Sequence, residues 1–219
     1  MQFQKLFEPG KIGAMEIRNR IVIPAMGLNY CTDRTLNERW LNFYEERARG
    51  GAGLMIVSAG IEHTGERGYE LLNTGDKDGY IPSLGHDKYL PGWQRLVEVA
   101  HKYGAKLGVQ ITHIGKYAHS SQLGGEQPVS PSAIQANMTV YGLPGEMPRE
   151  LTIPEIKLIE QNFANTVKRA KRAGIDVVEL NACSGYLVRE FLSPITNKRT
   201  DEYGGSLENR TRFLREMAA

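Results

Sequence analysis

The chain has 219 residues, of which 41% are hydrophobic and 24% charged, a balance typical of a folded globular protein. Lys and Arg number 27 against 25 Asp and Glu, and a net charge of +2 gives no indication of a nucleic-acid or anionic membrane partner. No apolar stretch approaches the roughly 20 residues needed to span a bilayer, and the N-terminus has no signal-peptide core. Cys31 and Cys183 are too far apart to indicate a disulfide framework or a thiolate metal site. We therefore expect a cytoplasmic protein that binds no metal at these cysteines.

Short apolar runs alternate along the chain with amphipathic segments. The runs predict strands at residues 20–25, 53–58, 106–111 and 176–180. The amphipathic segments predict helices at residues 36–49, 91–103, 152–173 and 206–217. Thr152 and Glu155 form a capping-box pattern at the start of the third helix. This order predicts an α/β fold with parallel strands covered on both faces, which either a barrel or an open doubly wound sheet satisfies.

Two features favour the barrel. Residues 7–18 predict a hairpin with turns at Pro9-Gly10 and at Gly13, and this N-terminal hairpin (residues 1–18) would plug the bottom of a barrel. No Gly-x-Gly-x-x-Gly motif follows the first strand, which disfavours a dinucleotide-binding sheet. Residues 112–151, rich in Gly, Ser, Pro and Gln, predict a long loop excursion over the site after the third strand. No change in composition marks a boundary, so residues 1–219 are predicted to form part of one domain.

In a parallel barrel the reactive residues lie at the carboxyl ends of the strands and in the loops that follow. Here this rule selects residues 24–27, 58–60, 110–113 and 181–186. These patches hold small residues and neutral hydrogen-bonding side chains and little charge. They suit a neutral, planar, amide-like ring better than a phosphorylated sugar or a metal ion.

Four motifs carry a resemblance to a known family. FLSPITNKRTDEYGGSLENRTRF, residues 191–213, is similar to the signature of the old yellow enzyme and 2,4-dienoyl-CoA reductase family, an NADH:flavin oxidoreductase family. LFEPGKIGAMEIRNRIVIPAMG, ERARGGAGLMIVSAG and GVQITHIGKYAH resemble the same family in the same order. The resemblance covers essentially the whole chain. It implies a (β/α)8 TIM barrel of which about the first four strand–helix units, a half-barrel, are present.

The resemblance implies FMN as cofactor, NAD(P)H as electron donor and an activated alkene, an enoate or a 2,4-dienoyl-CoA, as small-molecule substrate. Tyr186 matches the family's proton donor, and a phenol with a pKa of ~10 is protonated at neutral pH. Gln110 matches the side chain that hydrogen-bonds the pyrimidine edge of the flavin. The residues matched to cofactor contacts are Pro24, Ala25, Met26, Ala59, Gly60 and Gln110. The residues matched to the substrate side are Asn181, Ser184 and His113.

One departure from the family pattern concerns the substrate side. Many members carry His-x-x-His or His-x-x-Asn before the tyrosine, whereas this chain has Asn181-Ala182-Cys183-Ser184. Two uncharged donors therefore replace the imidazole pair that would stabilise an oxyanion. The 2,4-dienoyl-CoA reductase branch also lacks the simple pair and adds a 4Fe-4S cluster, whose cysteines would lie beyond Ala219.

Three alternatives stay open at this point. The chain is catalytically silent if FMN needs the phosphate site near the last two strands of such barrels. Unpaired edges of a half-barrel favour self-pairing, which leaves a homo-oligomer open. A non-flavin aldolase or isomerase ranks low, because no Lys is suitably placed and Glu179 lies one step inside the fourth strand. Several signature charges are predicted to be structural: Asp201, Glu202, Glu208 and Arg210.

Overall fold

The computed structural model describes residues 3–61, 81–137 and 143–219. The chain divides into two compact units. Unit 1 comprises Met1–Ala59, Asp78–Ile111 and Val167–Leu180, and unit 2 comprises Gly60–Lys77, Thr112–Thr166 and Asn181–Ala219. No helix in the described ranges has both the length and the apolar character needed to cross a membrane. The assignment of residues 1–219 to one domain stays a prediction.

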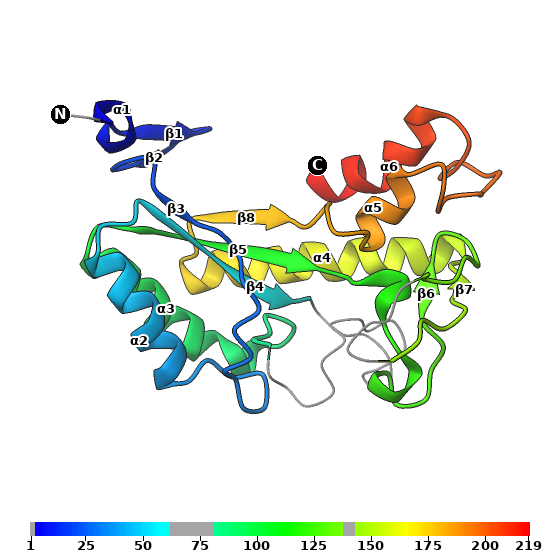
Figure 1. The fold of residues 1–219 in the computed structure, drawn as a ribbon, viewed down its shortest axis with the longest axis horizontal. Coiled ribbons are helices and arrows are strands. Elements are labelled where there is room, and N and C mark those ends of the chain that lie inside the picture. The colour runs from blue at the N-terminus through cyan, green and yellow to red at the C-terminus, as the bar shows by residue number, and fades with distance from the viewer. Residues whose placement is uncertain (1–2, 62–80, 138–142) are drawn as a thin grey trace. The chain divides into compact units, whose positions relative to one another are not determined.

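A four-stranded sheet forms the centre of unit 1 (Figure 1). Its strands are β3 (Val22–Ile23), β4 (Leu54–Gly60), β5 (Lys106–Thr112) and β8 (Val177–Leu180), in the order β3-β4-β5-β8. β3 pairs with β4 in parallel, and so does β5 with β8. The order advances in one direction, as in a barrel, whereas a doubly wound sheet reverses it. All four predicted strands are present, and this singly wound order agrees with the predicted partial TIM barrel.

Helices α2 (Glu38–Arg49) and α3 (Leu90–Lys102) pack against each other in unit 1. α2 begins after Asn37, whose side chain accepts a hydrogen bond from the Trp40 N–H and so caps the helix. α3 begins with Pro91 in its first turn, where a missing N–H is harmless. Their buried faces repeat at helical spacing and consist of Trp40, Leu41, Tyr44, Ala48, Leu90, Trp93, Leu96, Val97 and Ala100. Apolar periodicity therefore predicted both helices to within two residues.

The N-terminal segment forms the predicted hairpin. A short helix α1 (Gln4–Phe7) precedes β1 (Gly10–Ile12), which pairs antiparallel with β2 (Met15–Ile17). The hairpin turns at Gly13, whose φ of 58° is the left-handed region that glycine adopts without strain. Pro9-Gly10 leads into β1 and is not a second turn of the hairpin. Ile17 packs with Leu54 and Ile56 of β4, so the hairpin contacts the sheet at this strand, and its role as a barrel plug stays a prediction.

Asn19 links the hairpin to the sheet through its side-chain amide. Its Nδ2 donates to the Gly51 carbonyl at 2.8 Å, and its Oδ1 accepts from the Ile21 N–H at 3.0 Å. A Cβ on Gly53 would lie 2.6 Å from the Asn19 carbonyl, so this close approach requires glycine. These contacts lead the chain from the hairpin into β3.

Unit 2 contains short elements that the sequence did not predict. The excursion at residues 112–151 includes 3-10 helices Gly115–Tyr117 and Ser120–Gln122. It also holds β6 (Val129–Ser130), which pairs in parallel with β7 (Arg149–Glu150). α5 (Leu187–Leu192) was missed because one and a half turns are too short for a periodic pattern.

The longer helices begin at the predicted caps. α4 (Ile153–Ala173) opens with the capping box, in which Thr152 Oγ1 accepts from the Glu155 N–H and the Glu155 carboxylate accepts from the Thr152 N–H. α6 (Leu207–Ala218) begins after Ser206, whose hydroxyl accepts from the Asn209 N–H at 3.1 Å.

Candidate functional site

The carboxyl ends of β5 and β8 place two polar side chains side by side in unit 1. Gln110 and Glu179 are register partners in this parallel pair, so their side chains extend from the same face of the sheet. The Gln110 Nε2 donates a hydrogen bond to Glu179 Oε1. Gln110 is half-buried and Glu179 is exposed. The neutral amide predicted to contact a ring edge is therefore oriented by a carboxylate, a partner that only the strand register reveals.

Residues 24–26 follow β3 in unit 1. Pro24 and Met26 are exposed, with Met26 retaining 37% of its accessible surface. Ala25 is half-buried and packs against the cluster of Ile17, Leu54 and Ile56. An exposed Met beside a small residue leaves an apolar surface on which a flat ring can lie.

Ala59 and Gly60 end strand β4, and both are buried. The pleat places Ile56 and Ser58 on one face of β4 and Ala59 on the other. A Cβ on Gly108 would lie 3.3 Å from Ile56 Cγ1, so Gly108 and Ile56 are on the same face of the sheet. Gln110 lies two residues after Gly108 on β5, so its side chain extends from that face too. The Ala59 methyl group therefore points away from the Gln110 face, and only its backbone can serve a ligand on that face.

His113 follows β5 in unit 2 and is 1% exposed. Its Nδ1 accepts from the Gly115 N–H at 3.1 Å, and its carbonyl accepts from the Leu187 N–H at 3.0 Å. Because Nδ1 is an acceptor here, a neutral ring carries its proton on Nε2. His113 thus ties the end of β5 to the start of α5.

The loop after β8 brings Asn181, Cys183 and Ser184 together. Asn181 is buried; its Nδ2 donates to Thr112 Oγ1 at 3.2 Å, and its Oδ1 accepts from the Cys183 N–H at 3.1 Å. The Cys183 Sγ lies 3.1 Å from Asn181 Oδ1 and 3.3 Å from Ser184 Oγ. Ser184 is exposed and has a φ of 56°, a strained conformation for serine. Asn181 therefore shapes the loop, and Ser184 presents the exposed hydroxyl.

Tyr186 stands at the N-cap of α5, directly after this loop. Its ring packs edge-on against Tyr117, with centroids 6.1 Å apart and planes at 76°. It also packs against the buried cluster of Ile114, Ala118 and Leu123. Burial raises the pKa of Tyr186, with further contributions from Cys183 and Tyr117, so the phenol holds its proton well above neutral pH.

Gly185 makes the approach of the two tyrosines sterically feasible. Its φ is +77°, and a Cβ there would lie 2.7 Å from the Tyr117 hydroxyl oxygen. Any side chain at this position would strain the backbone and displace the Tyr117 ring. The Gly185-Tyr186 pair is thus set by both backbone geometry and packing.

A buried carboxyl group that no sequence pattern indicated lies next to this site. Glu190 of α5 is 1% exposed; its Oε1 accepts from the Lys116 N–H at 2.9 Å and its Oε2 from the Ser130 hydroxyl at 2.8 Å. Burial raises its pKa to about 7. Glu190 is adjacent to the signature motif, but its burial depends on residues 74 and 60 positions away, so no local pattern reveals it.

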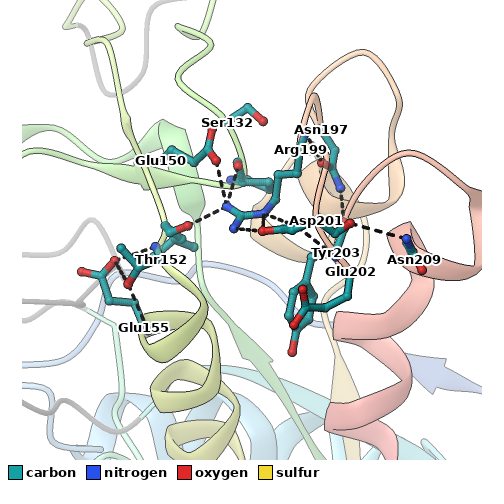
Figure 2. A network of polar contacts seen from close by, with 12 residues as sticks. Ser132, Glu150, Thr152, Glu155, Asn197, Arg199, Asp201, Glu202, Tyr203 and Asn209 are labelled. Carbon is teal, nitrogen blue, oxygen red and sulfur yellow. Dashed lines mark hydrogen bonds and ion pairs between the residues drawn. The ribbon is translucent and has the colours of Figure 1, made fainter.

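Two of the signature charges predicted to be structural, Asp201 and Arg210, make side-chain contacts within unit 2, whereas the structural role of Glu202 and Glu208 stays a prediction. Figure 2 shows Arg199 at the centre of a polar network in unit 2. It pairs with Asp201 at 2.5 Å and donates to the carbonyls of Pro131 at 3.0 Å and Leu151 at 2.6 Å. Arg210 donates to the Leu192 carbonyl, which ties α6 to the end of α5. The Arg199 network holds the loop between α5 and α6 in place.

Comparison with known proteins places these features in a family. A sequence model of the NADH:flavin oxidoreductase / NADH oxidase family matches residues 5–218. An NADPH dehydrogenase of Clostridium acetobutylicum is 42% identical over 97% of this chain and 58% of that protein. A metal reductase of Desulforamulus reducens is 42% identical over 98% of this chain and 30% of that protein.

Solved structures share the fold. The old yellow enzyme homologue from Zymomonas mobilis superposes with a TM-score of 0.83 at 30% identity, over 97% of this chain and 58% of that one. A 2-naphthoyl-CoA reductase complex superposes with a TM-score of 0.84 at 32% identity, over 97% of this chain and 32% of that one. The chain thus spans between about a third and three fifths of the length of these relatives. It belongs to the NADH:flavin oxidoreductase / NADH oxidase family.

Proposed function

We propose that this chain contributes to an FMN-dependent oxidoreductase that uses NAD(P)H to reduce an activated carbon–carbon double bond. The observation that carries the proposal is the family match across residues 5–218. The half-buried phenol of Tyr186, which holds its proton at neutral pH, supports the proposal, because reduction of an alkene needs an acid as well as a hydride donor.

The residues matched to cofactor contacts have the chemistry that a flavin ring needs. The Gln110 amide can both donate and accept, which fits the alternating donors and acceptors of the pyrimidine edge. Ala25 and Gly60 are small enough for close approach of a flat ring, and Met26 offers an exposed thioether. When bound, FMN would supply the two-electron chemistry between nicotinamide and alkene. Within the chain, Gln110 and the backbone near Ala59 would orient the ring.

Tyr186 is the proposed general acid. Its phenolic O–H would donate a proton to the alkene carbon opposite the one that receives hydride. A raised pKa keeps the proton in place until charge develops on that carbon, while the Tyr117 contact fixes the ring orientation. We propose that Ser184 donates a hydrogen bond to the substrate carbonyl, with Asn181 and His113 as positioning residues that shape the loop.

The substrates proposed for this chain form a narrower class than the substrates of the family as a whole. An enoate and a 2,4-dienoyl-CoA both present an alkene conjugated to a carbonyl, which stabilises the negative charge formed after hydride addition. One similar structure holds 2-naphthoyl-CoA, which is an aromatic acyl thioester. We therefore propose conjugated acyl thioesters and enoates as the substrates to test first.

The first test is an absorbance spectrum of the purified chain with and without added FMN. Bound flavin near one per chain would show that these residues build a cofactor site by themselves. A colourless chain beside a yellow full-length protein would show that the site needs residues outside this sequence. If the full-length protein also binds no FMN, the proposed function is wrong.

The second test separates the two half-reactions in the full-length protein. Tyr186→Phe is expected to slow flavin reoxidation by an alkene by about 10²–10⁴-fold, the range of general acid catalysis. Flavin reduction by NAD(P)H should persist. Tyr89→Phe removes the same phenolic oxygen from a buried tyrosine of unit 1 and is the matched control. Equal rates for Tyr186→Phe and Tyr89→Phe with the alkene would remove Tyr186 from the acid role.

A further inference from the structure

Unit 2 contains a hollow of about 500 Å³ that the proton transfer assigned to Tyr186 does not use. This volume lies in the range of small-molecule sites. It is lined by one acidic and two basic side chains and by neutral polar and apolar groups. The lining includes Lys116, Tyr117, Gln135, Gly185, Arg189 and Glu190.

Lys116 gives the hollow a buried positive charge. The residue is only 7% exposed, and its ammonium lies 5.9 Å from the centre of the Tyr117 ring. Within the described ranges no carboxylate forms an ion pair with this ammonium, although its positive charge partly opposes the rise in the pKa of Glu190. A buried ammonium is unfavourable without a compensating partner. The wall of the hollow is therefore arranged to receive negative charge.

Arg189 supplies a second cation. It lies on α5, is exposed, and lines the same hollow. None of the described carboxylates pairs with its guanidinium. A guanidinium offers a planar fork of donors that matches the two oxygens of a carboxylate or a phosphate. Two cations that line the same hollow favour binding of an oxyanion more strongly than one cation would.

Glu190 is the one acid among the lining residues, and hydrogen bonds and partial protonation reduce the effect of its negative charge on the hollow. Both of its carboxyl oxygens already accept hydrogen bonds, one from the Lys116 N–H and one from the Ser130 hydroxyl. Burial raises its pKa to about 7, so the group is partly protonated at neutral pH. The hollow therefore keeps a positive balance.

The hollow adjoins the proposed acid. Gly185 lines it and directly precedes Tyr186 in the chain. Tyr117 lines it too, and the Tyr117 ring packs edge-on against Tyr186. A substrate with its alkene at Tyr186 can therefore extend past Tyr117 into the hollow.

We propose that this hollow is a subsite for an anionic oxygen group, a carboxylate or a phosphate ester, carried by the substrate at the end away from its double bond. Lys116 and Arg189 would be its cationic contacts. The proposal rests on the alkene-reducing function proposed above and names a feature of its substrate.

The experiment compares three enoate esters of equal chain length in the full-length protein with FMN. One ends in a methyl group, one in a carboxylate and one in a phosphate ester. The readout is the ratio of kcat/KM for each anionic alkene to that for the neutral alkene. Arg189→Gln is expected to lower this ratio by about tenfold, the loss of one charge-assisted hydrogen bond. Lys116→Met should lower it by at least as much. Lys171→Met, an exposed lysine on α4, is the control.

Arg189→Gln keeps the test decisive if Lys116→Met fails to fold, because Arg189 is exposed. A ratio unchanged in Arg189→Gln, or lowered equally by Lys171→Met, would overturn the proposal. A fall confined to the carboxylate or to the phosphate substrate identifies which anion the subsite takes.

Calorimetry with adipate and with inorganic phosphate gives a readout besides turnover. Binding that Arg189→Gln weakens supports the anion subsite even if the wild-type protein reduces none of the alkenes, in which case only the proposed function fails. Absence of binding together with an unchanged ratio would refute the subsite.

Discussion

The two units differ in how they use polar side chains. Among the described residues, Ser83 is the one buried polar or charged residue of unit 1, whereas unit 2 has twelve such residues. Unit 1 buries strands and helix faces that are apolar along their length, as in β4 and α3. Unit 2 combines helices with long loops, and side-chain hydrogen bonds of Arg199, Asn197 and Glu190 connect these loops to one another.

This difference has a functional consequence. Polar residues of unit 1 that lie at strand ends, such as Gln110, are few and therefore stand out as candidates for ligand contact. In unit 2 many polar residues have partners within the protein, so a buried polar side chain there is by itself weak support for a catalytic role. Tyr186 and Ser184 are distinguished by their position in the loop after β8, not by their polarity.

The difference between the two units in buried polar contacts is tested most strongly by Arg199→Met in the full-length protein. The substitution leaves two backbone carbonyls without their donor and Asp201 without its ion pair (Figure 2). We expect the free energy of unfolding to fall by about 3–5 kcal/mol, because each buried carbonyl left without a donor costs about 1–3 kcal/mol. Urea denaturation followed by circular dichroism measures it.

Arg95→Met is the matched control in unit 1. Arg95 pairs with Glu38 at 2.7 Å, but both side chains are more than half exposed. Its loss should change the free energy of unfolding by less than about 1 kcal/mol. Equal effects of the two substitutions would show that the Arg199 network contributes no more than a surface pair.

The second prediction concerns the pH dependence that Glu190 gives to stability. Burial raises its pKa from 4.5 to about 7, so between these values the folded protein retains a proton that the unfolded chain has lost. Stability from this group is therefore full below pH 4.5 and decreases as the pH rises to 7. The total decrease is about 3 kcal/mol at 1.36 kcal/mol per pKa unit.

Glu190→Gln should remove that decrease while keeping an acceptor for the Lys116 N–H. The quantity to compare is the change in unfolding free energy between pH 4.5 and 8 in wild type and variant. Glu126→Gln, at an exposed position, is the control. Parallel pH profiles for wild type and Glu190→Gln would mean that Glu190 titrates alike in the folded and unfolded chain.

The third prediction uses two glycines with the same backbone. Gly185 and Gly205 have φ values of +77° and +76°, but a Cβ on Gly185 would strike Tyr117 and one on Gly205 would meet nothing within 4 Å. Gly205→Ala should cost about 1–2 kcal/mol of left-handed strain. Gly185→Ala should cost more and also slow alkene reduction, because it displaces the ring that orients Tyr186. Similar stability and turnover in both variants would contradict the packing role of Gly185.

Sequence predicted the elements whose determinants are local. The buried faces of α2 and α3 repeat every three or four residues, and Thr152 with Glu155 caps α4 within one turn. Features that depend on contacts between residues far apart in the chain could not be predicted from the sequence. The burial of Glu190 depends on Lys116 and Ser130, and the orientation of Gln110 depends on its register with Glu179. Tyr186 and Gln110 were proposed from family motifs, and only the structure shows what each one touches.

The smallest predicted effect is a change in FMN affinity on substitution of Gln110 in unit 1, the unit with few buried polar groups. Gln110→Ala removes one neutral hydrogen-bonding side chain, so FMN affinity should fall by roughly fivefold, or about 1 kcal/mol. Flavin fluorescence quenching in reconstituted full-length protein measures it, and Gln4→Ala, at an exposed position of α1, is the control. An unchanged affinity and redox potential would remove Gln110 from the cofactor contacts. Glu179→Ala then tests whether the hydrogen bond between the two side chains matters for the cofactor. If Glu179→Ala lowers FMN affinity as much as Gln110→Ala does, Glu179 orients the amide for the flavin. If only Gln110→Ala lowers FMN affinity, the hydrogen bond serves only the sheet.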